Sequence, residues 1–411
     1  MNILGKINPS KPITIIGGGI SGLSLGLYLK KMNLQYSIIE TKNQTGGKVG
    51  THQHSLGIVE KGPNALLLTN KTKILLQELN LNPIFPKKNL KRWVYYNKKC
   101  YSSKSLLIKL LFPFITHFFF QINFKKNWQS ISIESFLKPF YNEEKMHIIK
   151  AILSGIYGGD LKDFSLGAIL PDNLPPTFIK KHFLGIFMIK MILHIKKNSA
   201  DIFGSCSFKY GMEELVSALK KTQNKNIQLN QNFEPLNSET QNIIICTSAI
   251  EAAELLKKKS TYISHELKKI SYQSLYSTTI FSDKKIDRLD KSFGMLFAQN
   301  SNMGCLGILA NSEIFEGRTT GPHIHSYTLI HIVENIDQVF SILHLNVENI
   351  KYRETTFWQN ALPVYNTALF GAINNIKDYM KENPDEQIGL FGNYLGSIGL
   401  KNLLTPEIIF K

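Results

Sequence analysis

The sequence contains little cysteine. Its 411 residues include four cysteines, and no two of them have Cys-x-x-Cys spacing. This spacing argues against a thiolate metal site and against a disulfide framework, and it predicts free thiols in a reducing compartment. The four residues are Cys100, Cys206, Cys246 and Cys305.

Histidine clusters with metal-ligand spacing are also missing. His52 and His54 alternate along the chain, as do His323 and His325. Alternation with a period of two is typical of one face of a β-hairpin, which explains both pairs better than a metal site does. We therefore expect no bound metal.

Acidic residues are few: Asp and Glu number 31, against 48 Lys and Arg, so the net charge is +17. An excess of this sign predicts an acidic partner. Nucleic acid is disfavoured, because the basic residues gather around apolar, aromatic stretches that nucleic-acid modules do not need. With 43% hydrophobic residues, the chain is long enough to bury a large core in two or three lobes.

No apolar run in these stretches is long enough to cross a bilayer. Leu106 to Ile122 is shorter than the ~20 residues required, and Lys109, Pro113 and His117 interrupt it. A second apolar stretch, Phe183 to Ile195, is also flanked by lysines. Such stretches suit insertion into an anionic lipid surface, and two buried core helices with solvated lysines are the alternative. We expect no signal peptide, since a polar leader runs straight into the first strand.

The first fifty residues contain a complete nucleotide-binding βαβ pattern. An apolar strand, Ile13 to Ile16, leads into a turn with GxGxxG spacing. An amphipathic run, Leu23 to Met32, follows as a helix whose positive N-terminus would face a pyrophosphate. Glu40 ends the second strand near the spacing of about 20 residues at which an acid binds ribose hydroxyls. A glycine-rich turn with a surface glutamate is the alternative, but strand, helix and acid all appear where the motif requires them.

Three glycines have distinct tasks in this turn. Gly17 makes the tight bend, Gly19 lets the backbone approach the phosphates, and Gly22 lets the helix pack close to the strand. The acid at Glu40 also argues against a 2′-phosphate on the bound nucleotide.

Further motifs extend over the whole chain. After the acid come Gly46-Gly47-Lys48, an alternating hairpin from His52 to Glu60, and Glu60-Lys61-Gly62-Pro63. Later segments are Ser154 to Asp160, Ser207 to Leu215, Trp358-x-x-Ala361-Leu362-Pro363-x-Tyr365 and Gly392 to Leu400. In these motifs the chain resembles the protoporphyrinogen oxidase family of FAD-dependent flavoproteins, within the amine oxidase and phytoene desaturase group.

The resemblance implies an α/β fold with a Rossmann-like FAD-binding domain, an antiparallel-sheet substrate domain and a helical membrane-binding insert. In chain order we expect a first part of the FAD-binding domain with the hairpin (1–90), the insert (91–204), a second part of the FAD-binding domain (205–265), the substrate-binding sheet (266–352) and a C-terminal part of the FAD-binding domain (353–411).

FAD is expected to bind non-covalently, because no cysteine lies near the C-terminal motif. The resemblance implies that it is held by Gly17, Gly19, Ile20, Ser21, Gly22, Glu40, Gly46, Gly47, Lys48, Gly62, Pro63, Asn64, Trp358, Gly392, Asn393, Gly396, Ile398 and Gly399.

The family's reaction is the oxidation of protoporphyrinogen IX to protoporphyrin IX in haem biosynthesis. It removes six electrons in three two-electron steps, with molecular oxygen as acceptor and hydrogen peroxide as product. The flavin accepts the hydride, so no catalytic side chain is expected. By the resemblance, Lys71 is the candidate contact for a substrate propionate; an ordinary surface lysine at the start of a helix is the alternative.

Three functions stay open: a porphyrinogen oxidase, with coproporphyrinogen III as the alternative substrate; another flavin amine oxidase or desaturase; and a non-catalytic relative that binds lipid or porphyrin. Gln44, which stands where family members carry an arginine, leaves room for the third. The expected partners are the porphyrinogen, molecular oxygen and an anionic membrane surface, without nucleic acid, and a homodimer is left open. We expect the cytoplasmic side of the inner membrane, in peripheral or monotopic form, or the cytoplasm.

Overall fold

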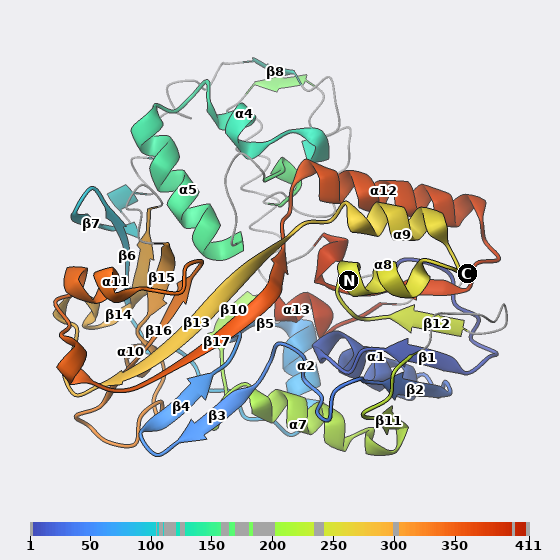
Figure 1. Cartoon of the computed structure of the whole chain (residues 1–411), viewed down its shortest axis with the longest axis horizontal. Coiled ribbons are helices and arrows are strands. Elements are labelled where there is room, and N and C mark those ends of the chain that lie inside the picture. Colours follow the sequence, from blue (N-terminus) through green and yellow to red (C-terminus); the bar gives the residue numbers. More distant parts are fainter. Residues whose placement is uncertain are drawn as a thin grey trace.

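The computed structural model describes residues 3–103, 105–106, 110, 121–123, 128–157, 164–168, 181–183, 202–233, 242–298, 304–396 and 399–407. The fold is mixed α/β, with one five-stranded sheet, one seven-stranded sheet and three small strand pairs (Figure 1). Among these residues, no helix is both long enough and apolar enough to span a membrane. All four cysteines are free, as predicted.

The five-stranded sheet contains the N-terminal nucleotide pattern. Its central strand pairs Ile13 with Tyr36 on one side and with Asn242 on the other, and every pair of neighbours runs parallel. Parallel strands are buried on both faces, which explains the continuous apolar character of these segments. The strand order is β11 (Ile227–Gln228), β2 (Tyr36–Ile39), β1 (Ile13–Ile16), β12 (Asn242–Ile245) and β18 (Ile388–Leu390).

Helices cover both faces of this sheet (Figure 1). Because alternate residues of a strand point to opposite faces, Ile13 and Ile15 pack with one set of helices and Ile16 packs with the other. The first set is α1 (Ile20–Lys31) and α7 (Glu213–Lys221), and the second is α8 (Ala249–Leu256), α9 (Thr261–Lys268) and α12 (Thr367–Glu382).

The seven-stranded sheet is antiparallel except for one pair, β14 with β6, which runs parallel. The predicted sheet of alternating segments is therefore present, and β6 and β7, which lie outside the expected range of 266–352, also belong to it. The order is β17 (Ile350–Pro363), β13 (Tyr272–Ser282), β16 (His325–His331), β15 (Cys305–Leu309), β14 (Ser292–Phe297), β6 (Lys91–Tyr96) and β7 (Lys99–Ser102).

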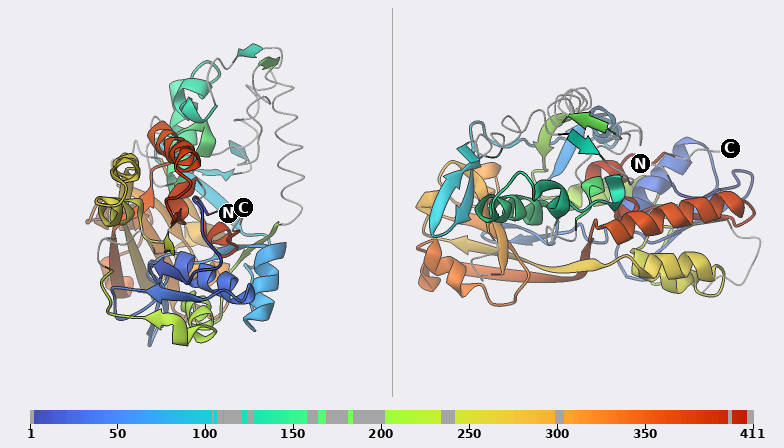
Figure 2. Two further views of the ribbon diagram at one scale, coloured as in Figure 1. Left: turned by 90° about the vertical axis from the view of Figure 1, so that its right-hand side faces the viewer. Right: turned by 90° about the horizontal axis from the view of Figure 1, so that it is seen from above.

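Each face of the large sheet is covered by its own helices. Tyr327 and Leu329 face a core that includes α11 (Asp337–Ile342). On the other face, Val94 and Leu296 pack under Ile148 of α5 (Glu143–Tyr157). Figure 2, seen from above, shows α5 lying across this sheet and α12 beside α9 over the parallel one. A short helix, α10 (Asn311–Ile314), precedes β16.

The segment 91–204, expected to be a helical insert, begins instead with the hairpin β6–β7. The strand Trp93 to Tyr96 is rich in aromatic and β-branched residues, which favour strands. Asn97 and Lys98, which join the strands, both have positive φ, as a two-residue hairpin turn requires. Likewise, β17 crosses the expected boundary at residue 353, and the domain boundaries stay predictions.

The two apolar stretches that predicted membrane contact lie almost entirely outside the described residues. The described parts of 91–204 include α4 (Ile133–Leu137) and the short strand pair β8 (Gln121–Asn123) with β9 (Lys181–Phe183). The remaining pairs are β5 (Leu66–Thr69) with β10 (Ile202–Cys206), and β3 (Thr51–His54) with β4 (Gly57–Glu60), which confirms the predicted hairpin. Two more helices are α2 (Asn70–Glu78) and α13 (Leu400–Leu403).

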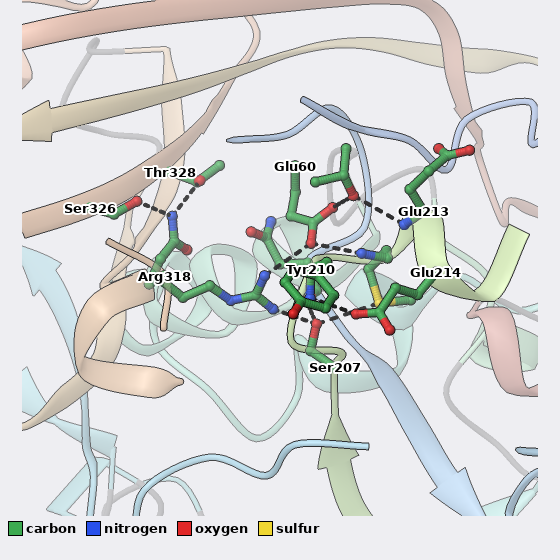
Figure 3. A network of polar contacts seen from close by, with 12 residues as sticks. Glu60, Ser207, Tyr210, Glu213, Glu214, Arg318, Ser326 and Thr328 are labelled. Carbon is green, nitrogen blue, oxygen red and sulfur yellow. Dashed lines mark hydrogen bonds and ion pairs between the residues drawn. The ribbon is translucent and has the colours of Figure 1, made fainter. Parts of the chain in front are cut away.

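A buried ion pair links the β3–β4 hairpin to the segment that precedes β16 (Figure 3). Glu60, at the end of β4, accepts from Arg318 at 3.2 Å, and both side chains are 3% exposed. Burial raises the pKa of Glu60, and the Thr51 hydroxyl and the Arg318 guanidinium oppose that shift. The carboxylate also accepts from the Thr51 hydroxyl at 2.7 Å and from the Met212 N–H at 2.9 Å. Arg318 further donates to the Ser207 hydroxyl.

Removing one partner of this pair should cost more stability than removing both. Arg318→Met leaves the Glu60 carboxylate buried without its cation, so we expect a loss of about 3–5 kcal/mol in unfolding free energy. Adding Glu60→Gln should recover part of this loss, because a neutral amide replaces the buried charge. Denaturant unfolding followed by circular dichroism measures both variants. A double variant less stable than Arg318→Met would contradict this account.

Candidate functional site

The predicted site residues gather at one edge of the parallel sheet. Since β1, β2, β12 and β18 run in one direction, their carboxyl ends share an edge. Gly17 follows β1 directly and donates its N–H to the carbonyl of Ile39 in β2 at 2.8 Å. Phe391, which precedes Gly392, donates to Ile245 of β12 at 2.9 Å. Three chain segments that are distant in sequence therefore meet here.

Two glycine segments lie against each other at this edge. The N–H of Gly46 donates to the carbonyl of Gly18 at 2.9 Å. A Cβ on Gly47 would lie 3.1 Å from the Cα of Gly19. Gly17 has a φ of +105°, which favours glycine. A Cβ on Gly22 would lie 1.9 Å from the carbonyl oxygen of Gly17, so only glycine allows α1 this close to β1. The tasks predicted for Gly17 and Gly22 match this geometry.

Helix α1 points an uncapped N-terminus at these glycines. Gly19 occupies the N-cap position, no described side chain accepts the first N–H groups, and no acid stands in the first turn. Ile20, Ser21 and Gly22 form that turn and are all buried. Free N–H groups and the helix dipole together make this end suitable for an anion such as a phosphate.

Glu40 is fixed in place by backbone donors. One carboxylate oxygen accepts from the Gly18 N–H at 2.7 Å and the other from the Lys42 N–H at 2.9 Å. The second oxygen also accepts from the Thr41 hydroxyl at 3.3 Å. A carboxylate has about four acceptor sites, so the oxygen bonded to Gly18 retains capacity for one more donor. The side chain is thus oriented beside the glycine turn and can still accept a bond from a hydroxyl group.

A second group of site residues joins the two sheets. Lys48 donates to the carbonyl of Ala361 at 2.6 Å and also to that of Asn360. Asn360 has a φ of +53° and lies where the register between β13 and β17 shifts, which is a β-bulge. Trp358 of the same strand donates its indole N–H to the carbonyl of Lys61 at 2.6 Å. The bulge of β17 is therefore bound to both loops around the hairpin.

The loop after the hairpin is held equally closely. A Cβ on Gly62 would lie 2.0 Å from the carbonyl oxygen of Lys48, and Pro63 comes next in the chain. The carbonyl of Asn64 accepts from the Ser207 hydroxyl at 2.9 Å, which connects this loop to the buried ion pair.

The C-terminal motif forms the third group. Gly392 and Asn393 follow β18, and the carbonyl of Asn393 accepts from the Tyr365 hydroxyl at 2.8 Å. Gly396 and Gly399 have φ values of +107° and +101°, and Gly399 precedes the short helix α13, as predicted. Ile398 lies outside the described residues, so its predicted place near the cofactor stays a prediction.

Lys71 is placed differently from the other predicted site residues. It lies in the first turn of α2, where its ammonium pairs with Glu407 and is largely exposed. Its assignment to a substrate carboxylate stays a prediction.

Three of the alternating histidines lie in strands, whereas His323 lies in a turn two residues before β16, so the expected alternation of His323 with His325 on one strand was wrong. His52 contacts Glu354 at 2.5 Å, and the ring of His54 stacks on Tyr352 at 3.8 Å. His325 begins β16. Within the described ranges, no three His, Cys, Asp or Glu side chains gather as metal ligands would.

Sequence reasoning missed Arg318 and Tyr272. Arg318 is a single arginine in a turn-like segment, and no local pattern shows that its partner is Glu60. Tyr272 begins β13, lies 5.8 Å from the ammonium of Lys48, and accepts from the N–H of Ala249 at 2.8 Å. The sequence offered one signal for Tyr272, which is an aromatic residue at the start of an alternating strand.

Gly22→Ala should disturb the contact between α1 and β1. The added methyl group meets the Gly17 carbonyl at 1.9 Å, so backbone must move, and we expect a loss of about 1–3 kcal/mol or more. Gly371→Ala in α12 is the matched control, because a Cβ there meets nothing within 4 Å and alanine favours a helix. Thermal unfolding should show a lower midpoint for the first variant alone.

Lys48 should make stability depend on pH above neutrality. Burial lowers the pKa of its amine to about 8, an effect that Glu251 partly opposes, whereas the unfolded chain has an ordinary value of about 10.4. Between these values the unfolded state holds more protons, so the contribution of Lys48 to unfolding free energy rises with pH. The unfolding free energy of wild type minus that of Lys48→Met, measured by denaturant unfolding, should increase from pH 8 to pH 10. A constant difference would contradict the shift.

Comparison with known proteins agrees with this arrangement. Residues 15–79 match the family model of an NAD(P)-binding Rossmann-like domain. Coproporphyrinogen III oxidase of Bacillus subtilis (strain 168) is 27% identical over 187 residues, which are 39% of this chain and 40% of that protein. That alignment therefore spans less than half of the relative. The mitochondrial protoporphyrinogen oxidase of Nicotiana tabacum is 22% identical, with 97% of this chain and 94% of the relative covered.

Solved structures share the fold over almost the whole chain. A putative protoporphyrinogen oxidase from Exiguobacterium sp. 255-15 superposes with a TM-score of 0.74 at 16% identity and covers 96% of each chain. Cyclohexylamine oxidase from Brevibacterium oxydans IH-35A gives a TM-score of 0.64 at 14% identity, covering 96% of this chain and 97% of its own. The named relatives, together with the Rossmann-like match, confirm the resemblance: this chain is similar to the protoporphyrinogen oxidase family.

Proposed function

We propose that the protein binds FAD non-covalently and oxidises protoporphyrinogen IX to protoporphyrin IX in haem biosynthesis. The proposal rests mainly on one observation. The edge of the parallel sheet that holds the facing glycine segments, here called the glycine edge, is hydrogen-bonded directly to the large sheet. Lys48 and Trp358 make these bonds, and both belong to motifs shared with the protoporphyrinogen oxidase family. The curated relatives named for porphyrinogen oxidation support the choice of substrate.

The residues at the sheet edge fit a flavin dinucleotide. The facing glycines leave backbone exposed where side chains would otherwise fill the space, and the N-terminus of α1 suits a pyrophosphate. Glu40 is oriented to accept ribose hydroxyls. Gly392, Asn393, Gly396 and Gly399 would complete the cradle from the C-terminal side.

The chain's own residues position the reactants rather than react. When bound, the flavin would supply the hydride acceptor. Lys48 holds the β17 bulge, and Trp358 holds the loop before Gly62, so the sheet and the glycine edge have a fixed separation. Overall, protoporphyrinogen IX and three molecules of oxygen would give protoporphyrin IX and three molecules of hydrogen peroxide.

Coproporphyrinogen III is the second candidate substrate. The observation in its favour is that the Bacillus subtilis coproporphyrinogen oxidase has the higher identity of the two relatives over the region that it matches.

We also propose that segment 91–204 lies on an anionic membrane surface at the cytoplasmic side. In support, the described hairpin at its start exposes four cations. They are Lys91, Arg92, Lys98 and Lys99. Basic residues near such a surface contribute about 1 kcal/mol each.

The test is oxidation of a porphyrinogen by the purified full chain. The protein in mild detergent should show flavin bands near ~370 and ~450 nm. Addition of protoporphyrinogen IX in air should make porphyrin fluorescence grow well above the spontaneous rate, with release of hydrogen peroxide. Glu40→Leu removes the expected ribose contact, so it should lower the flavin content and the rate together.

Three results would argue against the proposal in different ways. Faster turnover of coproporphyrinogen III would favour the second substrate. A flavin spectrum without porphyrinogen turnover would leave an amine oxidase or desaturase. Absence of flavin would favour a non-catalytic relative.

A further inference from the structure

Strand β17 forms one edge of the large sheet. It pairs with β13 on one side, and among the described residues no strand pairs with it on the other. With 14 residues it is more than twice as long as the usual strand of about 5–6. Figure 2, seen from above, shows this orange strand along the outer margin of the molecule. An edge of this kind presents a row of backbone N–H and C=O groups with which another strand can pair.

The second part of β17 is already bound to the rest of the chain. Lys48 bonds the carbonyls of Asn360 and Ala361, and the β-bulge at Asn360 interrupts the regular strand. The regular part of the edge is therefore the stretch 350–358, before the bulge.

The side chains of this stretch alternate between two faces. Those of one face contact the β3–β4 hairpin. Arg353, Thr355 and Phe357 share the opposite face, and all three are exposed. Phe357 is 51% exposed, and its ring centroid lies 4.6 Å from that of Tyr276, which fixes it on this face. An exposed aromatic ring beside an open strand edge is typical of a surface that a partner covers.

The residues of β17 favour one way of pairing with a second copy of the same strand. An antiparallel pair with its two-fold axis at Thr355 brings Arg353 opposite Phe357 and Glu354 opposite Thr356. Thr355 then lies opposite itself. Threonine pairs and a guanidinium beside an aromatic ring are favourable cross-strand neighbours. No charged side chain of this stretch then lies directly opposite one of the same sign.

Neighbouring registers are less favourable. An axis at Tyr352 sets Lys351 opposite Arg353, and an axis at Arg353 or at Glu354 sets that charged residue opposite itself. Like charges that lie directly opposite each other destabilise a strand pair. An axis one residue after Thr355 extends the pairing into the bulge at Asn360. The charges that protect this edge from indiscriminate pairing therefore permit the register centred on Thr355.

We propose that the edge of β17 is a homodimer interface, where β17 pairs antiparallel with β17 of a second copy around a two-fold axis at Thr355. The two large sheets then form one continuous sheet. Because both copies use the same surface, the interface is closed and adds no third copy. The paired stretch is short, so the dimer is reversible, with a dissociation constant of about micromolar size. This inference does not rest on the proposed porphyrinogen oxidation, and either can fail without the other.

Sedimentation velocity of the full chain in mild detergent tests the interface. Each chain has a net charge of +17, so salt of about 0.15 M or more is needed to screen the repulsion. Wild type should pass from monomer to dimer between roughly 1 and 100 μM. Phe357→Lys sets a cation opposite Arg353 on both sides of the axis, so it should raise the dissociation constant about tenfold or more. Ile74→Lys is the matched control, because Ile74 is 56% exposed and lies in α2.

A compensating substitution tests the register. Adding Arg353→Glu to Phe357→Lys places opposite charges across the axis, so the double variant should recover the dimer. Arg353 pairs with Asp337 at 3.3 Å at an exposed position, and the loss of such a pair costs the monomer little.

A cysteine on the proposed axis gives a second readout. In Thr355→Cys the two thiols lie opposite each other, with Cα atoms about 4.5–5.5 Å apart, which suits a disulfide. Diamide, which takes up the two thiol hydrogens, should therefore cross-link this variant into dimers on a non-reducing gel. Val347→Cys, at a position that is 69% exposed and precedes β17, should give no more dimer than wild type with its four native cysteines.

Four results would overturn the inference. Wild type that stays monomeric over the whole range has no such interface. A dimer that Phe357→Lys leaves intact, or equal cross-linking of the two cysteine variants, means that the copies meet through another surface. A double variant that stays as monomeric as Phe357→Lys excludes the register centred on Thr355.

Discussion

The arrangement of the two sheets depends on a buried pair of opposite charges. Glu60 ends the hairpin that follows the glycine edge, and Arg318 precedes a central strand of the large sheet. A single buried charge in either position would be strongly unfavourable, so each residue requires the other. Around this pair, donors from the start of α7 and from the hairpin occupy two more acceptor sites of the carboxylate. Sheet, hairpin and α7 therefore have one mutually consistent arrangement, and the Lys48 and Trp358 bonds build on it.

The sequence was sufficient for features that depend on local spacing. The glycine turn, the second strand with Glu40 and the hairpin were all predicted, because their backbone needs are met by nearby residues. Features that depend on pairing across the chain were not predictable in this way. Arg318 is separated from Glu60 by 258 positions, and a single arginine carries no sign of its partner. The β6–β7 hairpin was not predicted, because Lys91-Arg92-Trp93-Val94-Tyr95-Tyr96 has no alternating pattern and its turn is made by Asn97 and Lys98 without a glycine.

The residues of the site also divide into those that local spacing predicts and those that depend on contacts across the chain. Residues of the glycine edge were identified because their spacing follows from backbone geometry alone. Tyr272 was not identified, because its contacts with Lys48 and with the N–H of Ala249 join segments that are distant in the sequence. Lys48 was assigned to the cofactor, whereas the structure shows its ammonium bonded to the bulge of β17. Lys48 therefore holds β17 in place.

Strand β17 also fixes a distance. It carries Glu354, which contacts His52, and, a few residues later, the bulge bound by Lys48. A strand advances about 3.3 Å per residue and changes face at each step. An insertion or deletion of one residue between these points would turn one group of side chains away from its partner. This stretch can therefore change in evolution by exchange of side chains but not by the gain or loss of one residue.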